Sequence, residues 1–456
     1  MDATLTENLR ARVRGQLVLP ADEGYDGARK IYNAMIDKHP AIILRCAGAA
    51  DVIAAISFAQ EHNLLVSIRS GGHGIAGKAL CDGGLTIDLS RMKGIRVEPE
   101  KSTVRAEPGL TLGEFDRETQ SFGLATTLGV ASTTGIAGLT LGGGLGWLMG
   151  KYGLACDNLI SADLVTADSR LVRASAEENA DLLWGIRGGS GNFGVVTSLE
   201  YRLHSVGPLI LGGAVLYPLA KAKNFLRFFR EYAVETPDEL SMQGGMFTFN
   251  GTPVIGMAGC YCGPIAEGER VLKPLRTFAS PVADLFGTIP YIQMQSMFDS
   301  FLPPGKLHYW KSNFFESISD DAIEAFVHFT AQTPSRETFV WFPGEHLHGA
   351  AARVGPTESA FAHRGHPYNF SIFSIWSDPK DTEKNMAWTR AFWDAMQPFM
   401  AAGTYVNYLE DEGDPRERAA YGLGYDRLVA LKNRYDPSNF FRQNHNIKPT
   451  PQTQKA

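Results

Sequence analysis

Cysteine is scarce in this chain, with five residues among 456, and their positions match neither a disulfide framework nor a zinc site. The five are Cys46, Cys81, Cys156, Cys260 and Cys262. An odd number scattered along a long chain does not indicate paired cysteines. The C-x-C pair at the end of this series has no histidine or second cysteine pair near it in the sequence to complete a zinc site. We therefore expect reduced thiols in the core and no metal site.

Blocks of like charge are also missing. Lysine and arginine number 43 against 49 aspartates and glutamates, a net charge of −6, and no five like charges follow one another. Binding to nucleic acid or to an anionic membrane surface needs a basic patch, which this distribution does not indicate. The expected partner is therefore a small-molecule substrate, with no nucleic acid and no membrane. Whether the chain is a monomer or a homo-oligomer stays open.

Long apolar runs are absent as well. Residues 119–150 carry no charge, but nine of them are glycines, which does not fit a bilayer-spanning helix. The first residues contain no apolar segment typical of a secretion signal, so a cytoplasmic location is the default expectation. Dense glycine lets a backbone approach a ligand closely, because no Cβ stands in the way. A set of ordinary turns is the alternative.

The pattern of apolar residues predicts two kinds of domain. Up to about residue 205, helices alternate with short strands: helices are predicted over 49–63, 111–122 and 179–187, and strands over 64–69, 84–90, 102–107, 158–166 and 195–203. Beyond that point the strands become longer, over 209–217, 242–249, 254–261, 307–315, 339–342 and 369–376. Amphipathic helices are predicted over 321–332 and 384–400. The sequence thus indicates an α+β protein whose second domain is an antiparallel sheet covered by helices.

Two segments match the spacing G-x-G-x-x-G, beginning at Gly72 and Gly189. Neither has the strand before and the helix after that a Rossmann site for NAD requires. Glycine-rich loops can still offer backbone N–H groups to a diphosphate. The first loop also carries His73 between two glycines, and a neutral imidazole at that position is a nucleophile.

Several segments in chain order carry a resemblance to a known family. They are Arg69-Ser-Gly-Gly-His73, the glycine-rich stretch 135–146, residues 151–158, residues 181–196, Tyr405-Val-Asn-Tyr408 and residues 435–447. With these segments the chain resembles the FAD-linked oxidases of the vanillyl-alcohol oxidase type, within the group similar to berberine bridge enzyme and 6-hydroxy-D-nicotine oxidase.

The resemblance implies a two-part FAD-binding domain of the PCMH type with an inserted substrate domain. The FAD-binding domain would span residues 1–205, the substrate domain 206–400, and a C-terminal segment, 401–456, would return to the FAD domain. It also implies a set of cofactor-binding residues. They are Ile68, Arg69, Ser70, Gly71, Gly72, His73, Gly74, Gly129, Thr133, Thr134, Gly135, Gly138, Val196, Asn407, Asn444 and Asn446.

In this family the histidine matching His73 is bonded covalently to the flavin. Many members add a second bond from a cysteine, but this sequence has Ala131 at that position, and Cys156 lies too far along to replace it. The resemblance therefore implies FAD held by a single covalent link. Thr134 falls where some relatives control access of oxygen, and its shape resembles the permissive choice.

The resemblance also implies catalytic residues. Tyr408 matches the tyrosine that serves as the base in many relatives, and Tyr405, Tyr368 and Lys311 are its candidate neighbours. Since a free tyrosine has a pKa near 10, we expect a nearby cation such as Lys311 to favour its ionised form, or proton loss in concert with hydride loss. Packing in a core is the alternative for Tyr405 and Tyr408, and an exposed strand position is the alternative for Lys311.

The expected function is an oxidase. It would take a hydride from a carbon bearing OH or NH in a small cyclic or aromatic substrate, pass it to FAD and return hydrogen peroxide from molecular oxygen. Two alternatives remain at this stage. One is a flavin dehydrogenase that uses an acceptor other than oxygen, and the other is a flavin-binding protein without turnover.

Overall fold

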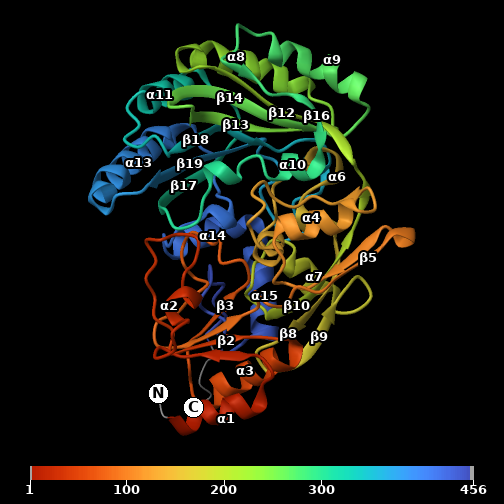
Figure 1. Cartoon of the computed structure of the whole chain (residues 1–456), viewed down its shortest axis with the longest axis vertical. Helices are drawn as coiled ribbons and strands as arrows, with labels where there is room; N and C mark the ends of the chain where they lie inside the picture. The colour runs from red at the N-terminus through yellow and green to blue at the C-terminus, as the bar shows by residue number, and fades with distance from the viewer. Residues whose placement is uncertain (1–2, 452–456) are drawn as a thin grey trace.

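The N-terminal part of the chain forms two main sheets, one mixed and one antiparallel, and a small two-stranded one (Figure 1). The computed structural model describes residues 3–451. The first sheet has the order β1 (Gln16–Val18), β2 (Ile42–Arg45), β4 (Leu85–Asp88) and β3 (Val66–Arg69), with helices α1 (Ala3–Arg12), α2 (Tyr25–Ala28) and α3 (Ala49–Glu61) in the same region. β2, β4 and β3 are parallel, so β3 and β4 end at the same edge, and the loop that carries His73 leaves from that edge.

The second sheet is antiparallel throughout. Its order is β5 (Ile95–Glu98), β6 (Thr103–Ala106), β10 (Val195–Arg202), β8 (Leu159–Val165) and β9 (Leu171–Ala174). The helices of this part are α4 (Leu112–Gln120), α5 (Ile136–Leu141), α6 (Met149–Tyr152) and α7 (Ala180–Ile186), and β7 (Leu124–Ala125) pairs with β11 (His204–Ser205). Helix α4 begins where the sequence places a start signal, because Thr111 and Glu114 form a capping box.

The strands from β12 onward form one eight-stranded antiparallel sheet. Its order is β15 (Ala283–Asp284), β12 (Leu209–Pro218), β14 (Thr252–Tyr261), β13 (Leu240–Phe249), β18 (Phe339–His346), β19 (Tyr368–Trp376) and β17 (Leu307–Phe315), and β16 (Gly287–Pro290) also pairs with β12. Four helices cover one face (Figure 1): α8 (Ala222–Tyr232), α9 (Ile265–Arg276), α11 (Asp320–Thr330) and α13 (Thr382–Met396). The other face looks toward the N-terminal part, where α10 (Tyr291–Gln295) lies.

The two faces of this sheet follow the alternation of the strands. On β19, Phe370 and Ile372 pack into the core under the helices, with Phe392 of α13, whereas Phe373 and Ile375 belong to the cluster on the opposite face. Side chains one residue apart point to opposite faces of a strand, so each strand contributes to both layers. An α+β architecture with an antiparallel sheet covered by helices, as the sequence predicts, is confirmed.

Most predicted boundaries lie within two residues of the observed ones, but two differ by four residues. Strand β18 continues past Phe342 to His346 through a bulge at Pro343 and Gly344, which in the sequence resemble the end of a strand. Helix α13 ends at Met396, because Pro398 allows only a short 3-10 turn beyond it.

After α13 the chain returns to the N-terminal part. Helices α14 (Asp414–Tyr421) and α15 (Tyr425–Tyr435) lie there, and Leu428 and Leu431 share a core cluster with Phe193 and Leu199. α12 (Gly349–Arg353) packs against α6. Among the helices of residues 3–451, none is long and apolar enough to cross a membrane.

Candidate active site

A cavity of about 310 Å³ lies where both N-terminal sheets, the large sheet and the returning C-terminal segment meet. The loop after β3 and the glycine-rich segment 129–145 form its walls at one end. At the other end the walls are the aromatic rings of Trp310, Phe339, Trp341 and Phe373, all nearly buried. One end is therefore made of loop backbone and the other of aromatic side chains, an arrangement suited to a large polar cofactor next to an apolar substrate.

Most of the residues that the sequence singles out for a cofactor lie on this cavity. Those that line it are Ile68, Ser70, Gly71, Gly72, His73, Gly74, Gly129, Thr134, Gly135, Gly138, Val196, Asn407 and Asn444. Three others do not. The guanidinium of Arg69 points to the carbonyl of Ala28, Thr133 contacts the ring of His73, and the buried side-chain oxygen of Asn446 has no partner.

The glycines at this end leave room for a ligand that approaches the backbone. A Cβ added at Gly74, Gly138 or Gly191 would meet no protein atom within 4 Å, although all three residues line the cavity. Elsewhere the same loops touch: a Cβ on Gly71 would lie 2.5 Å from the backbone nitrogen of Gly135. Two backbone segments in contact, with open space beside them, form a cradle that fits the diphosphate and ribityl parts of FAD.

His73 sits in the wall of this cradle with its ring held on two sides. The imidazole stacks on the ring of Tyr32, with centroids 3.9 Å apart, and Nε2 lies 3.1 Å from Oγ1 of Thr133. Burial lowers the pKa of His73 to about 4, so the ring is neutral at physiological pH. A neutral, oriented imidazole has the properties that a covalent attachment to flavin requires.

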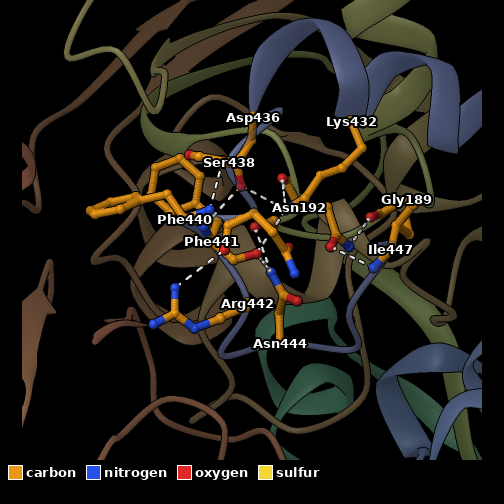
Figure 2. Close-up of polar contacts among 12 residues, drawn as sticks. Gly189, Asn192, Lys432, Asp436, Ser438, Phe440, Phe441, Arg442, Asn444 and Ile447 are labelled. Carbon is orange, nitrogen blue, oxygen red and sulfur yellow. Dashed lines mark hydrogen bonds and ion pairs between the residues drawn. The ribbon is translucent and has the colours of Figure 1, made fainter. Parts of the chain in front are cut away.

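The C-terminal segment that closes the cradle is fixed by a buried lysine (Figure 2). The Nζ atom of Lys432 donates to Asp436 at 2.7 Å, to the carbonyl of Asn192 at 2.9 Å and to that of Phe441 at 2.8 Å. Asn444 in turn donates to the carbonyl of Phe441 at 3.0 Å. The ion pair thus holds Phe441 and, through it, Asn444, both of which line the cavity.

Tyr408 lies at the aromatic end, with its hydroxyl bonded to a carboxyl group. It donates to Oε1 of Glu345 at 2.6 Å, and its ring meets the edges of Trp310 and Phe373. Burial raises the pKa of Glu345 to about 8. Burial, together with the nearby carboxyl, raises the pKa of Tyr408 well above its usual value. The pair can exchange a proton directly with each other.

Tyr405 also lines the cavity, but its hydroxyl oxygen already accepts two hydrogen bonds from the protein. It accepts hydrogen bonds from the backbone nitrogen of Gly144 at 2.9 Å and from the amide of Asn407 at 2.8 Å. These contacts tie the C-terminal segment to the glycine-rich loop, so Tyr405 positions the site through its hydroxyl.

Tyr368 and Lys311, the other two predicted neighbours of Tyr408, are not part of the cavity wall. Tyr368 belongs to the core under the helices and stacks on His346. Lys311 pairs with Glu412 at 3.0 Å and lies over the ring of Trp393. On β17 the side chain that faces the cavity is Trp310, and the next residue points to the other face. The group beside the Tyr408 hydroxyl is a carboxyl rather than the expected cation.

Sequence reasoning missed Glu345. Its carboxyl is buried and also accepts from Asn369 Nδ2 at 3.0 Å. Alternation along β18 puts it on the same face as Phe339 and Trp341, and the bulge sets it opposite Asn369. Within the bulge Gly344 has φ +85°, and a Cβ there would lie 1.8 Å from the carbonyl oxygen of Asn369. A single glutamate directly after an apolar strand and a Pro-Gly pair was the signal that could have indicated it.

The two positions relevant to a second covalent link lie apart. Ala131 lines the cavity and has no reactive atom. Cys156 is buried in a cluster with Phe314 and Phe361, and burial strongly raises the pKa of its thiol. Within residues 3–451 no group of three or more His, Cys, Asp or Glu side chains is arranged to hold a metal ion.

Comparisons with known proteins agree with this geometry. Residues 40–175 match the model of an FAD binding domain, and residues 404–448 match the model described as berberine and berberine like. An FAD-linked oxidoreductase of Dictyostelium discoideum is 34% identical over 433 residues, covering 94% of this chain and 93% of that protein. The (R)-6-hydroxynicotine oxidase of Paenarthrobacter nicotinovorans is 28% identical, with 96% and 97% covered.

Solved structures resemble the whole chain. The crystal structure of 6-hydroxy-D-nicotine oxidase from Arthrobacter nicotinovorans superposes with a TM-score of 0.89 at 27% identity, covering 96% of this chain and 98% of that one. A chitooligosaccharide oxidase gives a TM-score of 0.87 at 25% identity, with 98% and 100% covered. The similarity therefore extends over both the cradle and the large sheet.

Proposed function

Because this chain belongs to the FAD-linked oxidoreductases of the berberine-bridge-like, vanillyl-alcohol-oxidase type, we propose that it is an oxidase of small cyclic or aromatic alcohols or amines. It would remove a hydride from the carbon bearing OH or NH, with FAD attached through His73. The observation that carries the proposal is the Tyr408–Glu345 pair at the aromatic end of a cavity whose other end fits FAD. Relatives that act as oxidases on a hydroxynicotine and on chitooligosaccharides support it.

The residues that would hold the cofactor are those of the cradle. The backbone of residues 70–74 and 134–138 would contact the diphosphate and ribityl chain, and His73 would form the single covalent link. Bound flavin would supply the hydride acceptor and, in an oxidase, the group that reduces molecular oxygen to hydrogen peroxide.

The protein side of the reaction is proton removal. With Glu345 ionised, the Tyr408 hydroxyl can accept the proton of the substrate O–H or N–H while it passes its own proton to Oε1 of Glu345. This relay avoids a free tyrosinate, whose formation burial opposes. The rings of Trp310, Phe339, Trp341 and Phe373 would hold an apolar substrate skeleton and keep water away.

The test begins with the purified protein. It is precipitated in acid, flavin is measured in pellet and supernatant, and the intact mass is recorded. We expect flavin in the pellet and the mass of one FAD added to the chain. Cyclic and aromatic alcohols and amines are then screened by anaerobic bleaching of the flavin and by oxygen uptake. Bleaching without oxygen uptake would replace the oxidase by a dehydrogenase, and no bleaching by any compound would contradict the proposal.

A further inference from the structure

A second, much smaller cavity adjoins the aromatic end of the first. It measures about 30 Å³ and shares the walls of Phe339 and Trp341 with the larger one. Gln243 of β13 lines it and is fully buried, yet neither its amide nitrogen nor its amide oxygen has a hydrogen-bond partner. None of the residues that line this small cavity carries a charge, and apart from the indole of Trp341 the only lining side chain with a polar group is that of Gln243.

The sheet register explains why this amide is free. Gln243 pairs with Glu345 on β18 and with Ala258 on β14, so the three side chains stand in one row on the cavity face. The carboxyl of Glu345 is already bonded to Tyr408 and to Asn369. On the other side Ala258 is too short to fill the space or to bond an amide. The row therefore leads from the Tyr408 hydroxyl, by way of Glu345, to an amide that faces an unfilled pocket.

An unpartnered amide in an apolar pocket is costly for folding and is rare among buried side chains. Gln295 of α10 shows the ordinary arrangement in the same protein. It is equally buried, but its amide nitrogen donates to the carbonyl of Gly129 at 2.8 Å and its oxygen accepts from Tyr291. Gln243 has no such structural contact, so its place at the cavity calls for a ligand.

We infer that Gln243 determines specificity by binding a second hydroxyl group of the substrate, at a ring position away from the carbon that is oxidised. The inference rests on the proposed function and narrows its substrate class to ring compounds with at least two hydroxyl-type groups. An amide offers both a donor and an acceptor, which suits a neutral hydroxyl. The volume admits a hydroxyl or one water molecule but not a ring.

Matched pairs of compounds test this directly. The probes are cyclohexanol with each cyclohexanediol, benzyl alcohol with each hydroxybenzyl alcohol, and D-glucose with 2-deoxy-D-glucose. The measured quantity is the second-order rate constant of anaerobic flavin bleaching within each pair. We expect at least one pair in which the compound with the additional hydroxyl reacts about 10- to 100-fold faster, because its absence leaves the amide unpaired. The Gln243→Leu variant should bring that ratio close to one.

A second measurement does not depend on activity. Thermal unfolding of Gln243→Leu is compared with that of Gln295→Leu, a matched change at a buried amide that has partners. We expect Gln243→Leu to unfold at the temperature of the parent or above it, and Gln295→Leu to unfold at a clearly lower temperature. A decrease in unfolding temperature as large in Gln243→Leu as in Gln295→Leu would identify the amide of Gln243 as a structural group and overturn the inference.

The outcomes separate this inference from the proposed function. Equal rates within every pair, unchanged in Gln243→Leu, would overturn the hydroxyl subsite while the oxidase stands. If neither these probes nor the screened alcohols and amines bleach the flavin, the oxidase proposal fails, and the unfolding comparison alone then decides whether Gln243 is a ligand-binding or a structural residue.

Discussion

The hydroxyl of Tyr408 lies 2.6 Å from Oε1 of Glu345, although the two residues come from different parts of the fold. Glu345 stands on the large sheet, and Tyr408 lies on the C-terminal segment that returns to the N-terminal part. The pair therefore forms only when the returning segment is docked against the sheet. Because this contact joins the substrate face to the segment that closes the cofactor cradle, its disruption should be visible in catalysis.

Tyr408→Phe removes the proton acceptor and keeps the ring that packs against Trp310 and Phe373. Loss of a positioned acid–base group typically lowers a rate by about 10²–10⁴-fold, and we expect a decrease in this range for anaerobic flavin bleaching. Tyr405→Phe is the control, since the Tyr405 hydroxyl accepts bonds from Gly144 and Asn407. An equal loss in both variants would argue against a special role for Tyr408.

The rate of bleaching should depend on the ionisation of Glu345. The carboxyl must be deprotonated to receive a proton, and burial raises its pKa to about 8, so the rate should rise with pH through about pH 8 and then level off. Glu345→Gln should lower the rate and abolish this rise. A pH profile that keeps the same rise in Glu345→Gln would assign it to another group.

The same pKa shift affects stability in a defined direction. The carboxyl has a higher pKa in the folded protein than in the unfolded chain, where it is near 4.3, so the folded state binds the proton more tightly. The stabilisation of the folded state by the proton on Glu345 is complete below about pH 4.3 and is lost as pH rises through about 8. Relative to the parent, Glu345→Gln should therefore gain stability between pH 6 and pH 9 in thermal unfolding. A constant difference across that interval would show that the carboxyl is not buried in its protonated form.

His73→Ala should turn a covalent flavoprotein into one that releases its flavin in acid. The glycine cradle remains, so the variant should still bind FAD, and the added mass of one FAD should disappear from the intact protein. Thr133→Val is a useful comparison, because it removes the contact with Nε2 of His73 but leaves the imidazole. We expect flavin to attach more slowly in that variant. The intact mass, recorded over time while apoprotein is incubated with FAD, measures the rate of attachment. Flavin that remains bound in acid-treated His73→Ala would place the link elsewhere.

Gly344→Ala should displace Glu345. A Cβ at this position would meet the carbonyl oxygen of Asn369 at 1.8 Å, and the residue has φ +85°. Gly251→Ala is the matched control, since it has φ +79° but no atom within 4 Å of an added Cβ. In the control, backbone strain alone should lower the free energy of unfolding by about 1–3 kcal/mol. In Gly344→Ala the decrease should be larger, and anaerobic bleaching of the flavin should be far slower. Denaturant unfolding of both variants measures the difference.

Lys432→Met should destabilise the C-terminal segment. Lys432 and Asp436 are both fully buried, and removal of one partner leaves an uncompensated charge, which costs about 3–5 kcal/mol. Lys448→Met removes an exposed pair with Asp414 and should change the stability far less than Lys432→Met, because solvent screens an exposed pair. Unfolding of both variants in denaturant tests the contrast. Equal decreases in the free energy of unfolding would show that the buried pair does not stabilise the segment.

Local sequence patterns predicted most of the elements. The alternation of apolar residues located the long strands, and β17 has the predicted bounds, Leu307–Phe315. The prediction failed at β18, because Pro343 and Gly344 resemble a strand end when the neighbouring strands are unknown. A bulge is recognised only from the pairing on both sides, here with β13 and β19.

The sequence by itself determined the glycine-rich loops, the histidine between two glycines and the Tyr405–Tyr408 segment, because each is a short run whose chemistry depends on adjacent residues. Only the tertiary structure decided what those residues face. It set Glu345 against Tyr408, turned Lys311 toward Glu412, and left the amide of Gln243 without a partner. These contacts depend on the register of the sheet and on the return of the C-terminal segment, which bring together side chains that are distant along the chain.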